Sequence, residues 1–539
     1  MSASRVTSHD PFAGHPSASR RSVCSLLDRW AAESPEAAAL SFPTGESSHA
    51  ELRESSLEAA RRLRAGGVGP GDRVAILLRE ASEPYVAYGV GAMRLGAICV
   101  PINARNKTHE LAYVLGHSAP RLLLTEPSFG ELIDSAGLPE GCRAIVLGDG
   151  DFVAAGDEIT AAEVNELEED VERDDPALLL YTSGTTANPK GCLHTHASLL
   201  AEGENCSGRI GLEAGERFWT PLAMFHVGGW QVLMSAFTRG ACASHVGFFD
   251  AGTALGQLQR ERCTHAFPAF ELIWLGVLEH PDFPAADLSA LRVVINVGVP
   301  ERMRKMQELL PHVSQVSCLG MTESCGSLSI GRASDSLHSR THTSGHLLPG
   351  MEVRVVDPVS GAEQAPGEPG EMLFRGVTSF AGYYRDPETT ATVVDDEGWV
   401  RTGDLIRREE DGTIAFVSRL KDMLKVGGEN VSAAEIEGYL ITHPDVSVAA
   451  VVGAPDARYG EVPAAFVQLH KGASVDEQEL IGYCLGNIAT FKVPRYIRFV
   501  DEFPATATAK IQKFVLRERI DSELKERGIS EAPKPVTRP

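Results

Sequence analysis

Two stretches in which apolar strand patterns alternate with helix patterns constrain the fold of this chain most. The first stretch predicts strands at 73–78, 97–102 and 121–125, with helices at 83–96 and from Thr108. The second contains a helix from Ser198, a strand around 241–248, a helix from Gly252 and apolar segments at 264–270 and 291–300. Such alternation implies parallel strands covered by helices. The sequence therefore predicts an α/β fold.

The pattern changes after Gly345. Three short strand patterns separated by Gly and Pro turns, "MEVRVVD", "GEMLFRG" and "GTIAFVS", predict a small β-barrel-like subdomain. A smaller α+β region follows, with expected strands at 446–452, 464–469 and 496–500 and a helix near 476–486. We place the boundary between a large and a small domain near Arg419.

The length of 539 residues requires more than one domain, because single cores rarely exceed roughly 250–300 residues. We expect a flexible tail at 1–20, an N-terminal domain at 21–418 with two α/β subdomains and the small β subdomain, a C-terminal α+β domain at 419–525, and a second tail at 526–539. Residues 1–20 are polar and lack the apolar segment of a signal peptide.

The formal net charge of -23 argues against nonspecific binding to nucleic acid or to an anionic membrane surface. A local cluster of lysines and backbone amides can still bind a small anion. The most apolar long stretch, from Tyr85, contains Arg94 and predicts a buried helix and strand instead of a membrane span. Ten scattered cysteines without a C-x-x-C pair predict neither a disulfide framework nor a Cys-rich zinc site, and they fit a cytoplasmic location.

The segment "YTSGTTANPKG", Tyr181 to Gly191, has the composition of a phosphate-binding loop. Glycine lets backbone N–H groups approach an anion, and Ser, Thr and Lys add donors and charge. It is not a Walker A loop, which would need Gly at Pro189 and Ser or Thr at Gly191 when counted from Gly184. Another phosphate chemistry is therefore expected.

Four further motifs follow this loop in order. They are "LGMTES" (319–324), "WVRTGDL" (399–405), "SRLKDMLKVGGENVSAAEIE" (418–437) and "ATATAKIQK" (505–513). Together with the loop they resemble the adenylate-forming superfamily of acyl-CoA synthetases, peptide-synthetase adenylation domains and luciferases, from about residue 20 to about residue 520. The resemblance implies an AMP-binding domain followed by a small mobile C-terminal domain.

The resemblance implies a carboxylate that attacks the α-phosphorus of ATP and displaces pyrophosphate, with ATP, Mg²⁺ and coenzyme A as cofactors. The charge on three phosphates must be neutralised while two anions meet. The residues that match the family's phosphate loop are Thr182, Ser183, Gly184, Thr185, Thr186 and Lys190. The residues that match its second nucleotide motif are Gly320, Met321 and Thr322, with Glu323 as the Mg²⁺ ligand.

The remaining matches lie in the later motifs. Asp404 corresponds to the acceptor of the ribose hydroxyls, and Arg419 to a second ribose or phosphate contact. Lys510 corresponds to the lysine that bridges the attacking carboxylate and the α-phosphate. We expect Thr182, Lys190, Glu323 and Lys510 to be catalytic.

The family performs thioester formation after a rotation of its C-terminal domain. Lys421 matches the hinge position of that rotation, and "KVGGEN" matches the segment that then reaches the active site. This segment assigns Lys425, Gly427 and Gly428 to coenzyme A binding, because glycines let the pantetheine arm pass close to the backbone. An ordinary β-turn is the alternative for these residues.

Two other patterns permit different interpretations. In "CLHTH", alternation would place Cys192, His194 and His196 on one strand face as metal ligands, but the segment directly follows the phosphate loop, where the family has a passage from strand to helix. The glycines at 89, 91 and 96 resemble a dinucleotide fingerprint, but the third is two positions late and the glycines fall in a predicted helix. We favour structural roles for both patterns.

The expected acyl pocket differs from the family pattern. "PLAMFHVGGW" matches the pocket wall and places His226 and Trp230 near the acid, with His226 where peptide synthetases have an Asp that pairs an ammonium. An amino acid is therefore disfavoured as the substrate. The usual Gly-Gly-Ala-Pro run is Val297, Gly298, Val299 and Pro300, so two branched side chains should shorten or flatten the cavity. We expect a compact apolar acid, of short to medium chain, alicyclic or aromatic.

Three substitutions alter the nucleotide motifs. Leu319 replaces the aromatic residue that stacks on adenine, Ala509 replaces the Gly before the catalytic lysine, and Ser418 replaces the Gly before Arg419. The leading hypothesis is an AMP-forming acid–CoA ligase that acts as a monomer or homodimer on a small carboxylic acid, without nucleic acid or integral membrane contact. An amide synthetase that uses an amine acceptor, and a nucleotide sensor that has lost catalysis, are the alternatives.

Overall fold

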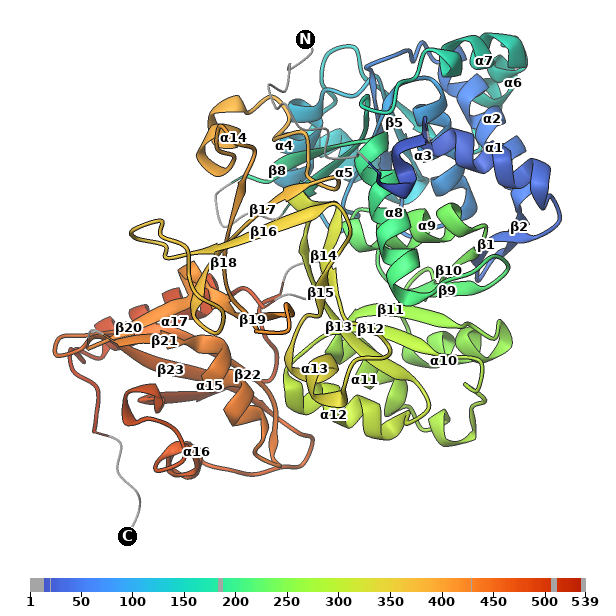
Figure 1. Ribbon diagram of the computed structural model, residues 1–539. Helices are drawn as coiled ribbons and strands as arrows, with labels where there is room; N and C mark the ends of the chain where they lie inside the picture. The colour runs from blue at the N-terminus through green and yellow to red at the C-terminus, as the bar shows by residue number, and fades with distance from the viewer. Residues whose placement is uncertain (1–13, 20, 183–187, 428, 506–510, 535–539) are drawn as a thin grey trace. The chain divides into compact units, whose positions relative to one another are not determined.

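The computed structural model describes residues 14–534 apart from 20, 183–187, 428 and 506–510 (Figure 1). The chain divides into two compact units. Unit 1 comprises Met1–Gly298, Arg302–Val353 and Phe374–Val400, and unit 2 comprises Val299–Glu301, Arg354–Leu373 and Arg401–Pro539. The functional domain limits and tails expected from the sequence stay predictions.

A sheet of six strands forms the first α/β part of unit 1, in the order β6-β5-β3-β4-β7-β8. Its strands are β3 (Arg73–Leu77), β4 (Ile98–Pro101), β5 (Leu122–Thr125), β6 (Arg143–Val146), β7 (Pro176–Thr182) and β8 (Lys190–Thr195). Neighbouring strands run parallel except β8, which is antiparallel to β7. The three strands expected between residues 73 and 125 are confirmed as neighbours in this sheet.

The helices of this part either precede β3 or lie between the strands of this sheet in the chain. They are α2 (His49–Ala65), α3 (Glu83–Arg94), α4 (Thr108–Ser118), α5 (Gly130–Ala136), α6 (Gly150–Gly156) and α7 (Ala161–Glu169). Helices α2 and α3 pack closely at Gly91, where an added Cβ would lie 2.9 Å from the Cβ of Ala59. Gly91 is therefore needed for helix packing. The buried Arg94 guanidinium at the end of α3 binds Asp28 at 2.7 Å, which explains a charge within this apolar stretch.

A sheet of nine strands forms the second α/β part, in the order β15-β14-β13-β12-β11-β9-β10-β1-β2. Its strands are β1 (Ala38–Phe42), β2 (Gly45–Ser48), β9 (Arg217–Thr220), β10 (Cys242–His245), β11 (His265–Phe270), β12 (Val293–Val297), β13 (Ser314–Met321), β14 (Gly326–Ile330) and β15 (His346–Leu347). The six strands from β13 to β1 run parallel, and antiparallel strands extend both ends. The sequence expectation of parallel strands is confirmed for the centre of this sheet.

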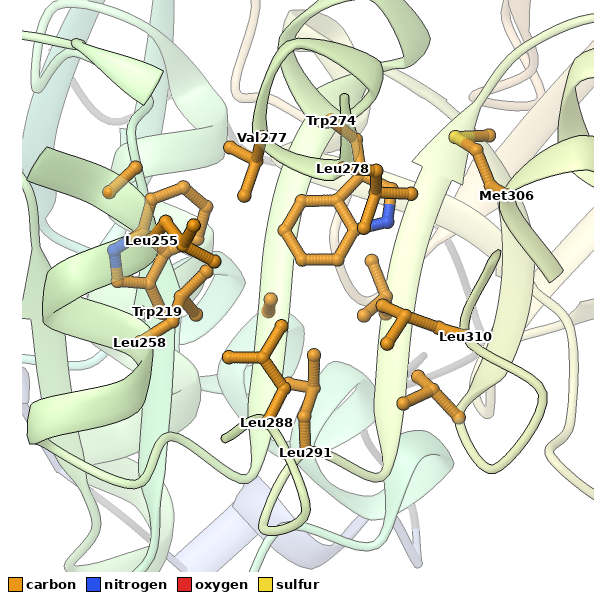
Figure 2. Close-up of a cluster of buried hydrophobic side chains, with 14 of the residues drawn as sticks. Trp219, Leu255, Leu258, Trp274, Val277, Leu278, Leu288, Leu291, Met306 and Leu310 are labelled. Atoms are coloured by element: carbon orange, nitrogen blue, oxygen red, sulfur yellow. The ribbon is translucent and has the colours of Figure 1, made fainter. Parts of the chain in front are cut away.

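The helices that accompany this sheet are α1 (Val23–Glu33), α8 (His196–Ile210), α9 (Val227–Arg239), α10 (Ala251–Arg260), α11 (Glu271–Leu278), α12 (Pro300–Leu309) and α13 (Leu337–His342), whereas α14 (Pro387–Val393) comes later in the chain and is not assigned to this sheet. Buried side chains from α10, α11 and β9 form one core cluster with Leu288 and Leu291 (Figure 2). Trp219 and Trp274 are both fully buried there, with ring centroids 6.4 Å apart. Burial of two such rings is worth several kcal/mol, so this cluster anchors the helices beside the sheet.

The segments expected to form a β subdomain make a four-stranded sheet in the order β16-β17-β18-β19. Its strands are β16 (Met351–Val356), β17 (Pro369–Gly376), β18 (Val400–Arg408) and β19 (Ile414–Arg419). Strands β18 and β19 are antiparallel neighbours in unit 2.

The remainder of unit 2 is an α+β fold around five strands. They are β20 (Met423–Val426), β21 (Glu429–Ser432), β22 (Val446–Asp456), β23 (Gly460–Leu469) and β24 (Tyr496–Phe499), with helices α15 (Ala433–Ile441), α16 (Glu477–Cys484) and α17 (Lys513–Glu526). Side chains of β22 alternate between two cores, because successive strand residues face opposite sides of a sheet. Val451 belongs to the core with α15 and α16, and Val452 to the core with α17. Within the described residues, no helix has the length and apolar character needed to cross a bilayer.

The close approach of α2 and α3 gives a stability prediction. We expect Gly91→Val to lower the free energy of unfolding by about 1–3 kcal/mol, because its side chain would press on the α2 backbone. Gly116→Ala in α4 is the matched control, since nothing lies within 4 Å of an added Cβ there. This control should be neutral or stabilising by up to about 1 kcal/mol. Urea unfolding monitored by circular dichroism measures both, and equal stability of the two variants would contradict the packing role of Gly91.

Candidate active site

Strands β7 and β8 hold the two ends of the expected phosphate loop. Thr182 is the last residue of β7 and Lys190 is the first of β8, and the two are register partners. Both side chains are partly exposed, and the Thr182 hydroxyl lies 3.4 Å from the carbonyl oxygen of Lys190. The four loop residues expected between them, Ser183, Gly184, Thr185 and Thr186, lie outside the described residues.

The "LGMTES" motif forms the tip of the β13–β14 hairpin. Gly320 is required there, because a Cβ at this position would lie 1.9 Å from the carbonyl oxygen of Gly326. The Met321 N–H donates to the Ser324 hydroxyl at 3.0 Å, and that hydroxyl donates to the Gly326 carbonyl at 2.7 Å. These contacts hold Thr322 and Glu323 in a short 3₁₀ turn with partly exposed side chains.

Residues 380–384 join this turn to strand β8. The Ala381 N–H donates to the Leu193 carbonyl at 2.8 Å, the Leu193 N–H donates to the Gly382 carbonyl at 3.1 Å, and the Tyr384 N–H donates to the Gly191 carbonyl at 2.8 Å. The Phe380 N–H also donates to the backbone carbonyl of Glu323 at 2.9 Å. The phosphate-loop strand and the "LGMTES" turn are therefore linked through one segment.

Tyr383 in this segment contacts two of the expected site residues. Its hydroxyl donates to Oε1 of Glu323 at 2.8 Å. The ammonium nitrogen of Lys190 lies 4.9 Å from the centroid of its ring, within the range of a cation–π contact. Sequence reasoning missed Tyr383, although an aromatic pair beside Gly382 in a segment between strands was a visible signal.

Three residues expected in the acyl pocket, and a fourth residue beside them, lie at, near or after the ends of parallel strands. His226 follows β9, Phe270 ends β11, Val297 ends β12 and Leu319 lies near the end of β13. Phe270 and Val297 are register partners, and the Phe270 and His226 rings meet edge to face at 6.4 Å. Ligands of α/β proteins bind outside the carboxyl ends of parallel strands. Phe270 was missed because its segment gave only a strand pattern.

The other pocket residues differ in exposure. Trp230 is buried, and its indole N–H donates to the Met224 carbonyl at 2.7 Å, so its ring lies in the core. Val297 is 45% exposed at the end of its strand. A Cβ at Gly298 would lie 2.3 Å from Oε2 of Glu271, so the Glu271 side chain fills the space above this glycine. Val299 belongs to the stretch that groups with unit 2.

The expected ribose residues pair with each other in unit 2. Asp404 on β18 and Arg419 on β19 are register partners, and the Arg419 Nε lies 2.8 Å from Oδ1 of the buried Asp404 carboxylate. The Asp404 N–H donates to the Thr402 hydroxyl at 3.0 Å. Directly opposed charged residues of antiparallel strands interact in this way, so the pairing follows from the register.

The expected coenzyme A segment is the tip of a β-hairpin in unit 2. Strands β20 and β21 pair with Val426 opposite Glu429, and Gly427 between them has a φ of 61°. The exposed Lys425 lies on β20, and Lys421 lies in the short 3₁₀ turn Leu420–Asp422 before it. Gly428 and the expected catalytic Lys510 lie outside the described residues.

The Cys192, His194 and His196 series does not share one strand face. Strand β8 ends at Thr195, and His196 is the first residue of α8. Burial lowers the pKa of both His194 and His196 to about 4, so both rings are neutral. Among the described residues, no group of three His, Cys, Asp or Glu side chains is arranged to hold a metal ion.

Comparison with known proteins identifies the family. Residues 27–384 match the family described as AMP-binding enzyme, and residues 435–510 match the family described as AMP-binding enzyme C-terminal domain. The chain belongs to the AMP-binding enzyme family. This confirms the resemblance to the adenylate-forming superfamily that the five sequence motifs indicate.

Individual relatives cover nearly the whole chain. A feruloyl-CoA synthase of an Amycolatopsis species is 34% identical over 497 residues, covering 91% of this chain and 97% of that protein. The crystal structure of the anthranilate CoA ligase AuaEII with anthranoyl-AMP has a TM-score of 0.85 and 28% identity, covering 94% of this chain and 98% of that chain. The amide bond synthetase McbA from Marinactinospora thermotolerans has a TM-score of 0.82 and 28% identity, covering 92% of this chain and 99% of that chain.

The residues of this AMP-binding enzyme fit a Mg²⁺ ion bound together with ATP. Mg²⁺ is usually held by one or two carboxylates plus substrate phosphates and water, so one well-oriented carboxylate is a sufficient protein contribution. Glu323 is such a carboxylate, since it is partly exposed and is held by Tyr383.

A buried carboxyl group supports the "LGMTES" hairpin of the enzyme. Glu202 on α8 is 1% exposed, and its Oε1 accepts a hydrogen bond from the Ser327 N–H at 2.9 Å. Burial raises the pKa of Glu202 well above its usual value, because it disfavours the charged form of the carboxyl group. Sequence analysis could not find this role, because a Glu in a helix pattern is usually a surface residue.

Glu202 therefore makes stability depend on pH. Its folded-state pKa exceeds its unfolded-state pKa, so its contribution is complete below about pH 4.5 and falls as the pH rises toward the folded-state value, by up to about 1.4 kcal/mol per pH unit. Glu202→Gln should remove this dependence. Its free energy of unfolding should therefore increase relative to wild type between pH 5 and pH 8.

Urea unfolding at three pH values tests this prediction. The exposed Glu131→Gln in α5 is the control, and its stability curve should stay parallel to that of the wild type. A parallel curve for Glu202→Gln would contradict a raised pKa of Glu202 in the folded protein.

Proposed function

We propose that this AMP-forming acid–CoA ligase adenylates a compact apolar carboxylic acid with ATP and transfers the acyl group to coenzyme A. One observation carries the proposal: Lys190 and Glu323, from two separate sequence motifs, both contact Tyr383. A cation and a carboxylate held at one place suit the charges of ATP phosphates and their counter-ion.

The first half-reaction joins the acid to AMP. A carboxylate oxygen attacks the α-phosphorus, the bond to the β-phosphate oxygen breaks, and pyrophosphate leaves. Lys190 would neutralise charge on the leaving pyrophosphate, and the hydroxyl of Thr182, together with the loop 183–186, would donate hydrogen bonds to it. Lys510 would bridge the attacking carboxylate and the α-phosphate. Mg²⁺, held by Glu323, supplies charge neutralisation at the phosphates when it is bound.

The second half-reaction transfers the acyl group. The thiol of coenzyme A attacks the acyl carbonyl, and AMP leaves. We propose that Asp404 and Arg419 hold the ribose, and that Lys425, Gly427 and Gly428 contact coenzyme A after rotation about Lys421. The hairpin position of Gly427 and the pairing of Asp404 with Arg419 support these roles.

The acid is proposed to be short to medium in chain length, alicyclic or aromatic. Glu271 fills the space beside Gly298, and Phe270 occupies the strand end between His226 and Val297. These contacts support a short pocket with an aromatic wall. The similar AuaEII structure contains an adenylate of an aromatic acid.

An amide synthetase is the second candidate, because the structure of the amide bond synthetase McbA aligns with 92% of this chain, with a TM-score of 0.82. It differs only in the acceptor that attacks the acyl-adenylate. AMP release from a panel of carboxylic acids, measured with coenzyme A, with amines and with neither, separates the two candidates. Release that depends on an amine and not on coenzyme A would reject the ligase.

Lys510 provides a direct test of the first half-reaction. We expect Lys510→Ala to lower the rate of acid-dependent pyrophosphate exchange by about 100-fold or more, because a donor that stabilises charge in the transition state is lost. Lys525→Ala, an exposed lysine in the last turn of α17, should exchange at the wild-type rate. Full exchange by Lys510→Ala would rule out the assigned role.

Val297 tests the pocket. Val297→Ala should raise kcat/KM for a C10 acid relative to a C6 acid by about 10-fold, since one methylene in such a pocket is worth about 1–3 kcal/mol. Val359→Ala, at a position that is 95% exposed, should leave the ratio unchanged. Turnover of palmitate, without turnover of C6 to C10 or ring carboxylates, would contradict a compact acid.

A further inference from the structure

We infer that Tyr383 is a positioning residue for adenylation, whose hydroxyl orients the Glu323 carboxylate and whose ring seats the Lys190 ammonium. The inference rests on the proposed function, because it assigns to Tyr383 the alignment of two groups that would act on ATP. Tyr383 itself touches no reacting atom in this mechanism.

The hydroxyl of Tyr383 restricts the Glu323 side chain. Its hydrogen bond to Oε1 is 2.8 Å long and joins residues 60 positions apart in the chain. A carboxylate held through one oxygen presents the other in a defined direction, and a cation needs only that oxygen. Hydrogen bonds that orient a metal ligand typically affect metal affinity or activity 10- to 100-fold when they are removed.

The ring of Tyr383 acts on Lys190 differently. The Lys190 ammonium lies 4.9 Å from the ring centroid. The ring face attracts the ammonium without placing an opposite charge beside it, so the ammonium can still interact with a phosphate. Among the described residues, no ion pair joins Lys190 to Glu323, and Tyr383 provides each of them with a neutral partner instead.

The backbone around Tyr383 is tightly held. Phe380, Ala381 and Tyr384 donate their N–H groups to carbonyls of Glu323, Leu193 and Gly191, respectively. The Tyr383 N–H donates to the Thr390 hydroxyl at 2.9 Å. A side chain on a backbone with these restraints loses little entropy when it orients its neighbours, which is the requirement for a positioning residue.

Binding of Mn²⁺ to the enzyme–ATP complex, followed by the electron paramagnetic resonance signal of free Mn²⁺, tests this role without turnover. Tyr383→Phe removes the hydroxyl and keeps the ring. We expect it to weaken Mn²⁺ binding about 10-fold. Pyrophosphate exchange should require correspondingly more Mg²⁺, while the KM for the acid stays within twofold of wild type.

Tyr383→Leu removes the ring as well. It should weaken the inhibition of AMP formation by pyrophosphate about 2- to 5-fold beyond the effect of Tyr383→Phe, as expected for loss of a cation–π contact. Tyr384→Phe is the matched control in the same segment and should match the wild type in every measurement. Circular dichroism and thermal unfolding of each variant establish that it is folded.

The possible outcomes separate the inference from the proposed function. Mn²⁺ affinity of Tyr383→Phe within twofold of wild type would overturn the inference, as would a fall in exchange with unchanged Mn²⁺ affinity. If the wild type binds Mn²⁺ with ATP but no acid supports exchange, the ligase proposal fails. Weaker Mn²⁺ binding by Tyr383→Phe would then still support the positioning role.

Discussion

Backbone hydrogen bonds between residues 380–384 and strand β8 are the constraint on which the rest of the site depends. Strand β8 is antiparallel to β7, so its first residue, Lys190, is placed opposite Thr182. The segment that pairs with β8 also reaches the backbone of Glu323. These hydrogen bonds hold the phosphate-loop strand and the "LGMTES" turn together, although the two motifs lie more than a hundred residues apart in the chain. Tyr383 lies in the linking segment and contacts one side chain of each motif.

Buried polar side chains hold the "LGMTES" hairpin in place. Glu202 is buried beside the "LGMTES" hairpin, where it accepts the Ser327 N–H and where burial raises its pKa. Gln231 donates to the Ser327 hydroxyl at 2.8 Å, so the same strand residue is held from two helices. A satisfied polar contact of this kind restricts a hairpin more specifically than apolar packing would. The neutral rings of His194 and His196 have the same cause, which is burial.

The geometry of parallel strands explains the other half of the site. Consecutive βα units bring the carboxyl ends of β9, β11, β12 and β13 to one edge of the sheet, so His226, Phe270, Val297 and Leu319 gather there although they are spread over almost a hundred residues. Their strand patterns are apolar for a different reason, because both faces of the sheet are covered by helices. The residues just beyond each strand do not have to be apolar, so their side chains can contact a ligand.

The sequence by itself determined the α/β class, the approximate strands and helices, the motif series and the family, because local periodicity and short motifs are properties of neighbouring residues. It also predicted Lys190 and Glu323 as site residues from their motifs. Only the tertiary structure decided that Tyr383 contacts both of them, that Glu202 is buried and has a raised pKa, that His196 leaves strand β8, and that Trp230 lies in the core. Each of these depends on hydrogen bonds or burial contributed by residues distant in the chain, and no local pattern encodes such contacts.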